Sequence, residues 1–262
     1  MSGPPDIRIA PDGREWGHAA ASLVHAVSEE AIRSHGRFLL ALSGGSTPKT
    51  LYQTMVSPEW SRRFNWPQMF FLFGDERCVP QEHAESNFRM AQAALFQPAG
   101  IAPDHIYRIQ GEHPDPETAA ERYEEALRRL THTVAPEMPR IDLILLGLGE
   151  DGHTASLFPG TAALQEQRRA VTVGHAPQGI VTRLTVTLGV INRATVVLFL
   201  VAGSSKAGIV RAILEPDSAA DRALPAALVA PETGRLMWML DRSAAARLTI
   251  LHHDAIRGDG QT

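Results

Sequence analysis

Apolar residues along this chain gather in short runs, and most of these runs are separated by segments with helical spacing of apolar positions. The runs are rich in leucine, β-branched and aromatic residues and cover 38–42, 69–73, 141–146, 181–186, 195–201 and 236–240. Short runs that are apolar nearly throughout, rather than alternating, are typical of strands buried on both faces. We therefore predict strands at these positions, inside a sheet.

The helical pattern covers 15–34, 48–55, 87–95, 118–130 and 206–214. Strands that alternate with helices predict βα units, and so an α/β fold with an open, mostly parallel sheet and helices on both faces. The stretch 110–116 is polar, contains two prolines and reads as a surface loop. No repeat, low-complexity stretch or clear linker divides the chain, so we expect a single domain over 1–262.

Composition narrows the class of protein. The chain has 262 residues, 44% of them hydrophobic and 21% charged, with a formal net charge of -4. This mildly acidic balance lacks the excess of positive charge that binds nucleic acid or an anionic membrane. The single cysteine, Cys78, excludes an internal disulfide and suits a reducing compartment. Without a secretory pattern at the start or a run of membrane-spanning length, we expect a soluble, cytoplasmic protein with a frayed polar tail at 252–262.

Loops that follow parallel strands meet at one edge of the sheet, where α/β proteins hold ligands. The loop Gly147–Gly160 directly follows the run 141–146 and carries Glu150, Asp151 and His153 among glycines. Glycine lets the backbone turn tightly, and histidine takes and returns protons near neutral pH. Such a loop taken alone is more often a tight turn with a surface histidine, so its meaning depends on the other strand ends.

A second strand-end loop runs from Ser43 through Gly44, Gly45 and Ser46 to Thr47, before a predicted helix. Thr47 suits the N-cap and Pro48 the first helical position. Free backbone N–H groups, hydroxyls and a helix N-terminus favour an anion, most naturally phosphate, although an ordinary capped turn is an equal alternative. The spacing is not that of a nucleotide-binding Walker loop.

Charged residues follow two further strands. Arg77, after 69–73, could grip a phosphate or carboxylate, while Asp75 and Glu76 could hold its guanidinium or accept sugar hydroxyls. Lys206 follows Gly203, Ser204 and Ser205, either serine of which could cap a helix; a cation in a first helical turn makes sense beside a bound anion. The alternative for all these charges is a solvated surface.

Two classes of enzyme site lack their signals. No Cys or His pair has zinc spacing, since His252 and His253 are adjacent, so we expect no metal. The chain also has no Gly-x-Ser-x-Gly elbow, which argues against a serine hydrolase.

Together these residues resemble the 6-phosphogluconolactonase branch of the glucosamine-6-phosphate isomerase/6-phosphogluconolactonase superfamily. The resemblance spans almost the whole chain and rests on five motifs in order, at 43–48, 75–80 with 86–87 downstream, 147–160, 205–206 and 225–229. It implies a modified Rossmann-like (NagB-like) fold and hydrolysis of 6-phospho-D-glucono-1,5-lactone to 6-phosphogluconate. It further implies the second step of the oxidative pentose phosphate pathway, without a cofactor.

Two alternatives stay open. The isomerase/deaminase branch shares the fold and the Asp-Gly-His core, but its members have Asp-Glu-Tyr where this chain has 75–77, and Asn-Glu-Pro where it has 157–159. The same fold also serves as a sugar-phosphate sensor in transcription regulators. The stretch before Phe38 is too short and not basic enough for an attached DNA-binding unit.

The lactonase interpretation assigns roles. We expect His153 to act as general base and Asp151 to orient its imidazole, with Glu150 a weaker candidate. Residues 43–47, Arg77 and Lys206 would hold the phosphate of a small sugar-phosphate lactone, and Asp75 would belong to the same substrate site. The sequence leaves open whether the protein is a monomer or a homodimer.

Overall fold

The computed structural model describes residues 4–11 and 13–249. Its centre is a six-stranded sheet in the order β1-β9-β8-β5-β2-β3, in which every neighbouring pair is parallel. The strands are β1 Asp6–Ala10, β2 Phe38–Leu42, β3 Met69–Phe73, β5 Leu143–Leu146, β8 Val196–Val201 and β9 Arg235–Asp241. This arrangement confirms the predicted α/β class and mostly parallel sheet.

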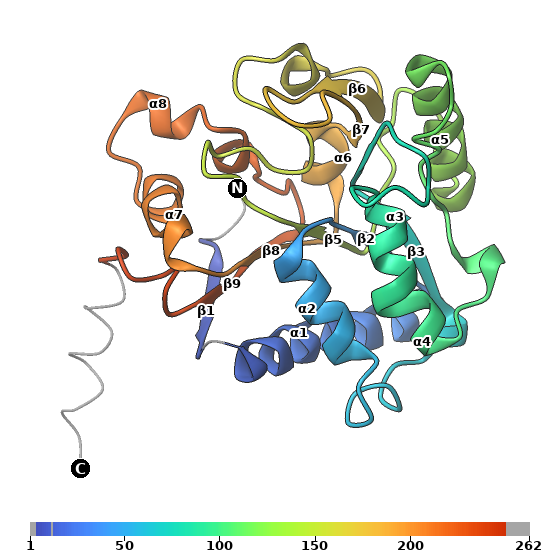
Figure 1. The fold of residues 1–262 in the computed structure, drawn as a ribbon, viewed down its shortest axis with the longest axis horizontal. Coiled ribbons are helices and arrows are strands. Elements are labelled where there is room, and N and C mark those ends of the chain that lie inside the picture. Colours follow the sequence, from blue (N-terminus) through green and yellow to red (C-terminus); the bar gives the residue numbers. More distant parts are fainter. Residues whose placement is uncertain (1–3, 12, 250–262) are drawn as a thin grey trace.

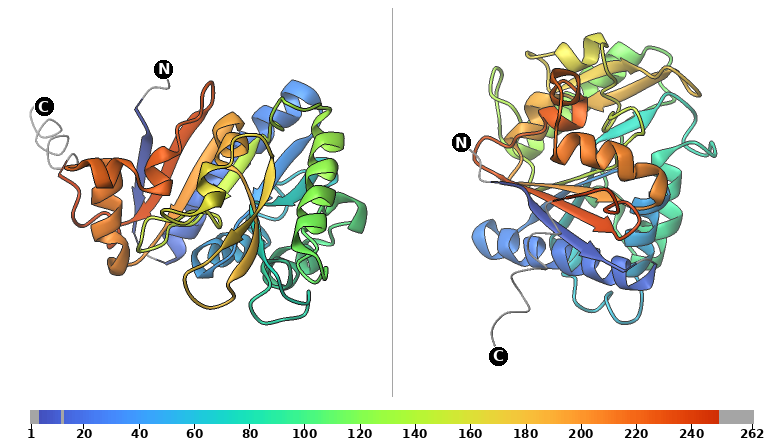
Figure 2. Two further views of the ribbon diagram at one scale, coloured as in Figure 1. Left: turned by 90° about the horizontal axis from the view of Figure 1, so that it is seen from above. Right: turned by 90° about the vertical axis from the view of Figure 1, so that its left-hand side faces the viewer.

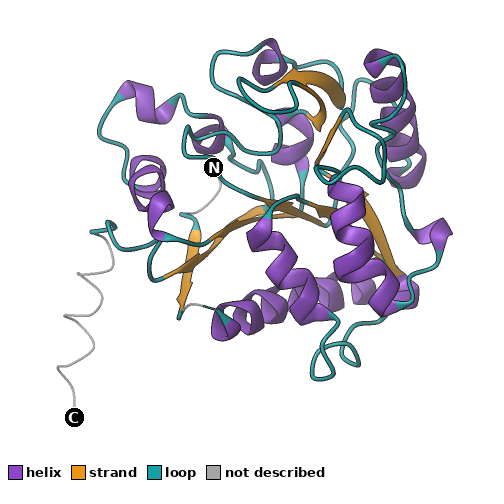
Figure 3. Ribbon diagram, viewed as in Figure 1, coloured by secondary structure: helices purple, strands orange, loops and turns teal. Residues whose placement is uncertain are grey.

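Helices cover both faces of this sheet, as predicted (Figures 1 and 3). One face carries α1 Arg14–His35, α2 Ser46–Met55, and the continuous helical segment of α3 Asn87–Ala91, a π-helical turn at 92–96 and α4 Gln97–Ala99. The other carries α5 Pro116–Thr131, α6 Leu188–Arg193, α7 Ala207–Leu214 and α8 Ala219–Arg222. Figure 2 shows α1 running beneath β1 and β9 at one edge of the sheet. None of the described helices is long and apolar enough to cross a membrane.

A second, three-stranded sheet lies above the first and corrects one prediction. It joins β4 Asp75–Arg77, β7 Thr182–Val186 and β6 Val171–His175 as antiparallel pairs. Our prediction that the run 181–186 belongs to the parallel sheet is therefore wrong. The loop 176–181 that joins β6 to β7 is too short for a parallel crossover, so the two strands pair as a hairpin.

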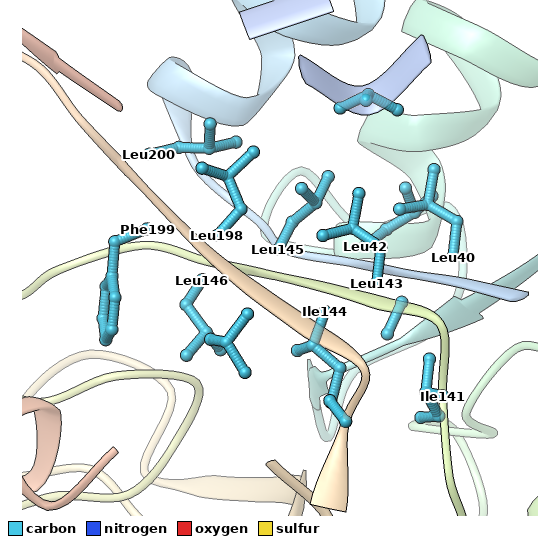
Figure 4. Packing of buried hydrophobic residues seen from close by; sticks show 14 of the residues in the cluster. Leu40, Leu42, Ile141, Leu143, Ile144, Leu145, Leu146, Leu198, Phe199 and Leu200 are labelled. Atoms are coloured by element: carbon cyan, nitrogen blue, oxygen red, sulfur yellow. The ribbon is translucent and has the colours of Figure 1, made fainter. Parts of the chain in front are cut away.

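The central strand β5 shows why near-continuous apolar runs became buried strands. All four of its residues are at most 1% exposed. Alternate side chains point to opposite faces of the sheet: Leu145 lies with Leu198 on one side, and Leu146 lies with Phe199 on the other (Figure 4). Both faces are covered by helices or by the second sheet, so both need apolar side chains.

Two buried tyrosines fix the ends of the strands that lead into the functional edge. The Tyr52 hydroxyl accepts from the Ser43 N–H (3.0 Å) and donates to the Ser43 carbonyl (2.8 Å). The Tyr123 hydroxyl makes the same pair of bonds with Phe73, at 2.8 and 2.9 Å. Burial raises the pKa of both phenols, which therefore stay protonated and keep donating. Strands β2 and β3 thus end at defined points.

Two helix starts differ from the prediction. Helix α2 begins at Ser46 with Gly45 as N-cap, so the predictions of Thr47 as N-cap and of Pro48 as first helical residue are wrong. Gly203, not Ser204 or Ser205, caps the 3₁₀ turn that leads into α7. Gly45 and Gly203 have φ of 104° and 100°, which only glycine adopts without strain, so the sharp exit from each strand decides the cap. The expectation for the tail at 252–262 lies outside the described residues.

Candidate active site

A cavity of about 270 Å³ lies at the carboxyl edge of β2, β5 and β8 and brings the predicted loops together. Of the residues predicted for the site, Asp151 and the candidates Glu76 and Glu150 do not line it; Asp151 contacts the site through His153. The lining residues are Ser43, Gly44, Gly45, Ser46, Thr47, Pro48, Asp75, Arg77, Asn87, Gly147, Leu148, Gly149, His153, Ala155, Arg183, Leu200, Val201, Ala202 and Lys206.

His153 and Asp151 form a close pair within one loop. Asp151 Oδ1 lies 2.6 Å from His153 Nδ1 and also accepts the backbone N–H of His153 at 3.1 Å. Because the Nδ1–H of His153 donates a hydrogen bond to the carboxylate, the other ring nitrogen, Nε2, is left as the proton acceptor. Partial burial acts to raise the pKa of Asp151, but the hydrogen bonds from His153 outweigh it and hold that pKa below its ordinary value. The carboxylate is therefore charged at neutral pH and orients the ring.

Glu150, the weaker candidate for that contact, lies elsewhere. Its carboxylate is 4.0 Å from Lys206 Nζ and its side chain is 66% exposed. The ring of His153 packs instead against Phe158, with centroids 4.4 Å apart. The imidazole is thus held by a carboxylate at Nδ1 and by an aromatic ring against its face.

Gly149 leaves the space that the His153–Asp151 pair occupies. A Cβ at this position would lie 2.0 Å from His153 Nδ1 and 2.4 Å from Asp151 Oδ1. Such distances are far below van der Waals contact, so any side chain would displace the pair. The glycine is required by the two side chains opposite it.

With His153 in the general-base role predicted from the sequence, we expect Gly149→Ala to lower kcat by about 10²-fold, because a displacement of the order of 1 Å at such a group has that cost. Gly208→Ala in α7, where a Cβ meets only Arg247 at 3.4 Å, is the matched control and should keep its activity. Steady-state kinetics of both variants, with circular dichroism to verify folding, make the comparison. A folded Gly149→Ala enzyme with wild-type kcat would show that the pair tolerates displacement.

Positive charge is concentrated in the cavity although the whole chain is acidic. Arg77, Arg183 and Lys206 all line it. Burial, and next the charge of Arg77, lower the pKa of Arg183 below its ordinary value. Arg77 Nε is buried without a hydrogen-bond partner among the described residues. Two guanidinium groups that repel one another, with an unused N–H donor, favour an anion between them.

Sequence reasoning missed Arg183. It lies on β7, which antiparallel pairing with β4 places beside Arg77. A usable signal was present, because an arginine interrupts an otherwise uncharged strand at 181–186. Its partner could not be read from the chain, since the two arginines are brought together only by the second sheet.

Asp75 lies buried at the floor of the cavity. Its Oδ2 accepts from Ser156 Oγ at 2.7 Å, and its Oδ1 accepts from Asn87 Nδ2 at 3.2 Å. The prediction that Asp75 or Glu76 holds the Arg77 guanidinium is wrong for the described geometry: Arg77 Nη1 donates to the Glu85 carbonyl at 2.6 Å. Asp75 instead ties the His153 loop to the 75–87 segment.

Glu76 holds the same segment, 75–87, through hydrogen bonds to its backbone. Its carboxylate accepts the backbone N–H groups of Arg77, Asn87 and Phe88, each at 2.8 Å. Burial raises the pKa of Glu76, and these hydrogen bonds oppose the rise. The bonds to Asn87 and Phe88 cap the start of α3 and place Asn87 in the cavity wall. There a Cβ on Gly44 would lie 1.9 Å from Asn87 Oδ1, so position 44 also has to be glycine.

The loop 43–47 presents the start of α2 to the cavity. No side chain caps this helix, and its first turn carries no acidic residue. The backbone N–H groups of a first helical turn have no partner within the helix, and they lie at the positive end of its dipole. The geometry is therefore that of an anion-binding helix N-terminus.

Comparison with known proteins places this site in context. The family model for glucosamine-6-phosphate isomerases/6-phosphogluconolactonase matches residues 11–238. A 6-phosphogluconolactonase from Nostoc sp. is 36% identical, over 93% of this chain and 98% of its own length.

Solved structures agree with the sequence comparison. The 6-phosphogluconolactonase from Trypanosoma cruzi superposes with a TM-score of 0.82 at 31% identity, over 95% of this chain and 98% of the other. A monomeric glucosamine-6-phosphate deaminase superposes with a TM-score of 0.75 at 22% identity, over 93% of this chain and 100% of the other, which shows a shared fold alone.

Proposed function

The chain belongs to the glucosamine-6-phosphate isomerase/6-phosphogluconolactonase family, and from this membership we propose that it hydrolyses 6-phospho-D-glucono-1,5-lactone to 6-phospho-D-gluconate. The observation that carries the proposal is the His153–Asp151 pair at a cavity lined by Arg77, Arg183 and Lys206. A proton acceptor beside a concentrated positive charge suits an anionic substrate that is opened by water. Relatives named as 6-phosphogluconolactonases support the assignment.

In the proposed mechanism, His153 Nε2 takes a proton from a water molecule as its oxygen attacks the C1 carbonyl. The tetrahedral intermediate then collapses, and the bond between C1 and the ring oxygen breaks. The imidazolium returns its proton to that oxygen, which leaves as the C5 hydroxyl. Asp151, hydrogen-bonded at Nδ1, stabilises the imidazolium between the two proton transfers. The reaction consumes one water and needs no redox partner.

The phosphate would be held by the loop 43–47, Arg77 and Lys206, with Arg183 as an additional cation. Arg77 and Arg183 offer planar N–H donors, and the N-terminus of α2 offers backbone N–H groups. Held at this end, the substrate would place C1 near His153, so binding energy away from the reacting bond orients the carbonyl.

The cavity favours the lactonase over the deaminase reaction. Deamination with isomerisation needs a base for the C2 proton besides the histidine. Among the described residues that line the cavity, Asp75 supplies the only carboxylate. Ser156 and Asn87 already donate hydrogen bonds to both of its oxygens. Leu157 and Phe158, where deaminases carry Asn and Glu, supply no acid or base.

The deciding experiment offers two substrates to the purified protein. Freshly made 6-phosphogluconolactone is followed in a pH-stat, and glucosamine 6-phosphate is followed by ammonia release. We expect rapid acid production from the first and no ammonia from the second. Ammonia release without lactone hydrolysis would assign the chain to the other branch of the family.

The lowered pKa of Asp151 gives a further prediction about stability. A carboxyl with a lower pKa in the folded state contributes stability above its unfolded pKa of about 3.9, and this contribution is lost as the pH falls through the folded value. We expect Asp151→Asn to lower Tm at pH 7, with a deficit that shrinks as the pH falls below about 4. Thermal unfolding of both proteins between pH 7 and pH 3 measures this, and a pH-independent deficit would contradict it.

A further inference from the structure

A second, larger hollow of about 450 Å³ lies at the opposite edge of the main sheet. It is formed where β2, β5, β8 and β9 begin, against the carboxyl-terminal half of α1. Strand β2 has five residues, and at about 3.3 Å per residue it spans roughly 15 Å. One small ligand therefore cannot occupy both this amino-edge hollow and the catalytic cavity.

Three arginines from different elements converge on the amino-edge hollow: Arg37 before β2, Arg140 before β5 and Arg235 at the start of β9. Among the described residues, each of these guanidinium groups donates to one neighbouring residue and has further N–H groups to spare. Arg37 donates to the Leu130 carbonyl at 2.8 Å, Arg140 to Thr195 Oγ1 at 3.1 Å, and Arg235 to Glu30 at 2.5 Å. A guanidinium has five N–H donors, so most of this donor capacity remains for a ligand.

The carboxylates of the hollow do not balance this charge. Glu30 pairs with Arg235. Asp142 is buried and accepts from the Leu39 N–H at 2.8 Å, and its other oxygen lies 3.1 Å from His35 Nε2. Three guanidinium groups thus face two carboxylates, and neither carboxylate pairs with Arg37 or Arg140 in the described structure. The lining has an excess of positive charge even with His35 neutral.

Part of the remaining wall is apolar. Val27, Ala31 and Leu39 line the hollow together with the hydroxyl residues Ser34, Thr131 and Thr195. The volume falls within the range of small-molecule sites, which combine an apolar wall with a few convergent polar groups. This pairing of surfaces suits a ligand with two phosphate groups and a ring.

We propose that the amino-edge hollow is a second ligand site, which binds a small diphosphorylated metabolite through Arg37, Arg140 and Arg235. A nucleoside diphosphate and a sugar bisphosphate share this chemistry. The phosphates would contact the arginines, and the ring would lie on Val27, Ala31 and Leu39. The site is independent of the lactonase assignment, because it shares no residue with the catalytic cavity.

Isothermal titration at low ionic strength tests the proposal with three probes: pyrophosphate, ADP and fructose 1,6-bisphosphate. We expect saturable binding of ADP or the bisphosphate, and weaker binding of pyrophosphate, which has no ring. Arg140→Gln should weaken that binding about 10-fold or more, because it removes a charge-assisted contact. The hydrogen bond from Arg140 to Thr195 is exposed, so the variant should fold normally, as circular dichroism can verify.

Two control variants locate the ligand. Arg129→Gln changes an exposed arginine on α5 outside the hollow, and Lys206→Gln changes the catalytic cavity. Neither should alter the measured affinity. Absence of saturable binding by ADP and by the bisphosphate would overturn the proposal. So would binding that Lys206→Gln abolishes and Arg140→Gln leaves intact, because the ligand would then occupy the catalytic cavity.

Discussion

Replacing His153 with Asn is expected to lower kcat for 6-phosphogluconolactone by about 10²–10⁴-fold while KM changes little. The asparagine can still form hydrogen bonds, but it cannot take a proton from water or return one to the ring oxygen. The imidazole lies at the cavity with Asp151 2.6 Å from Nδ1, so the variant removes the proposed proton shuttle and leaves the charged residues of the site in place.

His132→Asn is the matched control for this loss. His132 follows α5, lies outside the cavity and has φ of 55°, a conformation that asparagine tolerates well. Steady-state kinetics should show wild-type kcat for this control. A folded His153→Asn enzyme with near-wild-type kcat would remove His153 from the mechanism, whereas a large rise in KM alone would assign it to binding.

The second large effect is expected when Arg77 and Lys206 are both replaced by Ala. Each charge-assisted contact to phosphate is worth roughly 1.5–3 kcal/mol, so the pair should reduce kcat/KM for the phosphorylated lactone by about 10²–10⁴-fold. Turnover of the unphosphorylated lactone should change far less, because it lacks the group that these residues are proposed to hold. Since distant binding energy also orients the reacting carbonyl, kcat for the phosphorylated substrate should fall as well.

The comparison of the two lactones separates recognition of phosphate from general damage. Arg129→Ala, at an exposed arginine whose ion pair within the described chain is with Glu125 in its own helix, is the charge control. It should leave both activities unchanged. Equal losses on both lactones in the double variant would mean that Arg77 and Lys206 act on something other than the phosphate. The single variant Arg183→Ala should follow the same pattern with a smaller loss, if it faces the same group.

The local pattern of hydrophobic residues was sufficient to predict much of this fold. The runs 38–42 and 69–73 form strands with those bounds, because five apolar residues in succession can be buried only where both faces of a sheet are covered. Strands that alternate with helices also predicted the parallel sheet. Since parallel strands deliver their following loops to one edge, the loops at 43–47 and 147–160 and Lys206 could be placed together in advance.

Short elements with weak pattern escaped prediction. Strands β1 and β6 and helices α6 and α8 are four to six residues long, too short for a period to stand out from its surroundings. The helix caps were mistaken because hydroxyl side chains were preferred over the glycines before them. The left-handed backbone at Gly45 and Gly203 decided otherwise, and the sequence does not display a backbone angle.

What the sequence determined by itself is the α/β class, the positions of most main strands along the chain and which loops share an edge, because these depend on periodicity within a few residues. Only the tertiary structure decided how the site is completed. It pairs Ser156 with Asp75, 81 residues earlier, brings Arg183 beside Arg77, and presses Asn87 against Gly44. Such contacts follow from the second sheet and from close packing between segments that are far apart along the chain, where no local pattern specifies the partner.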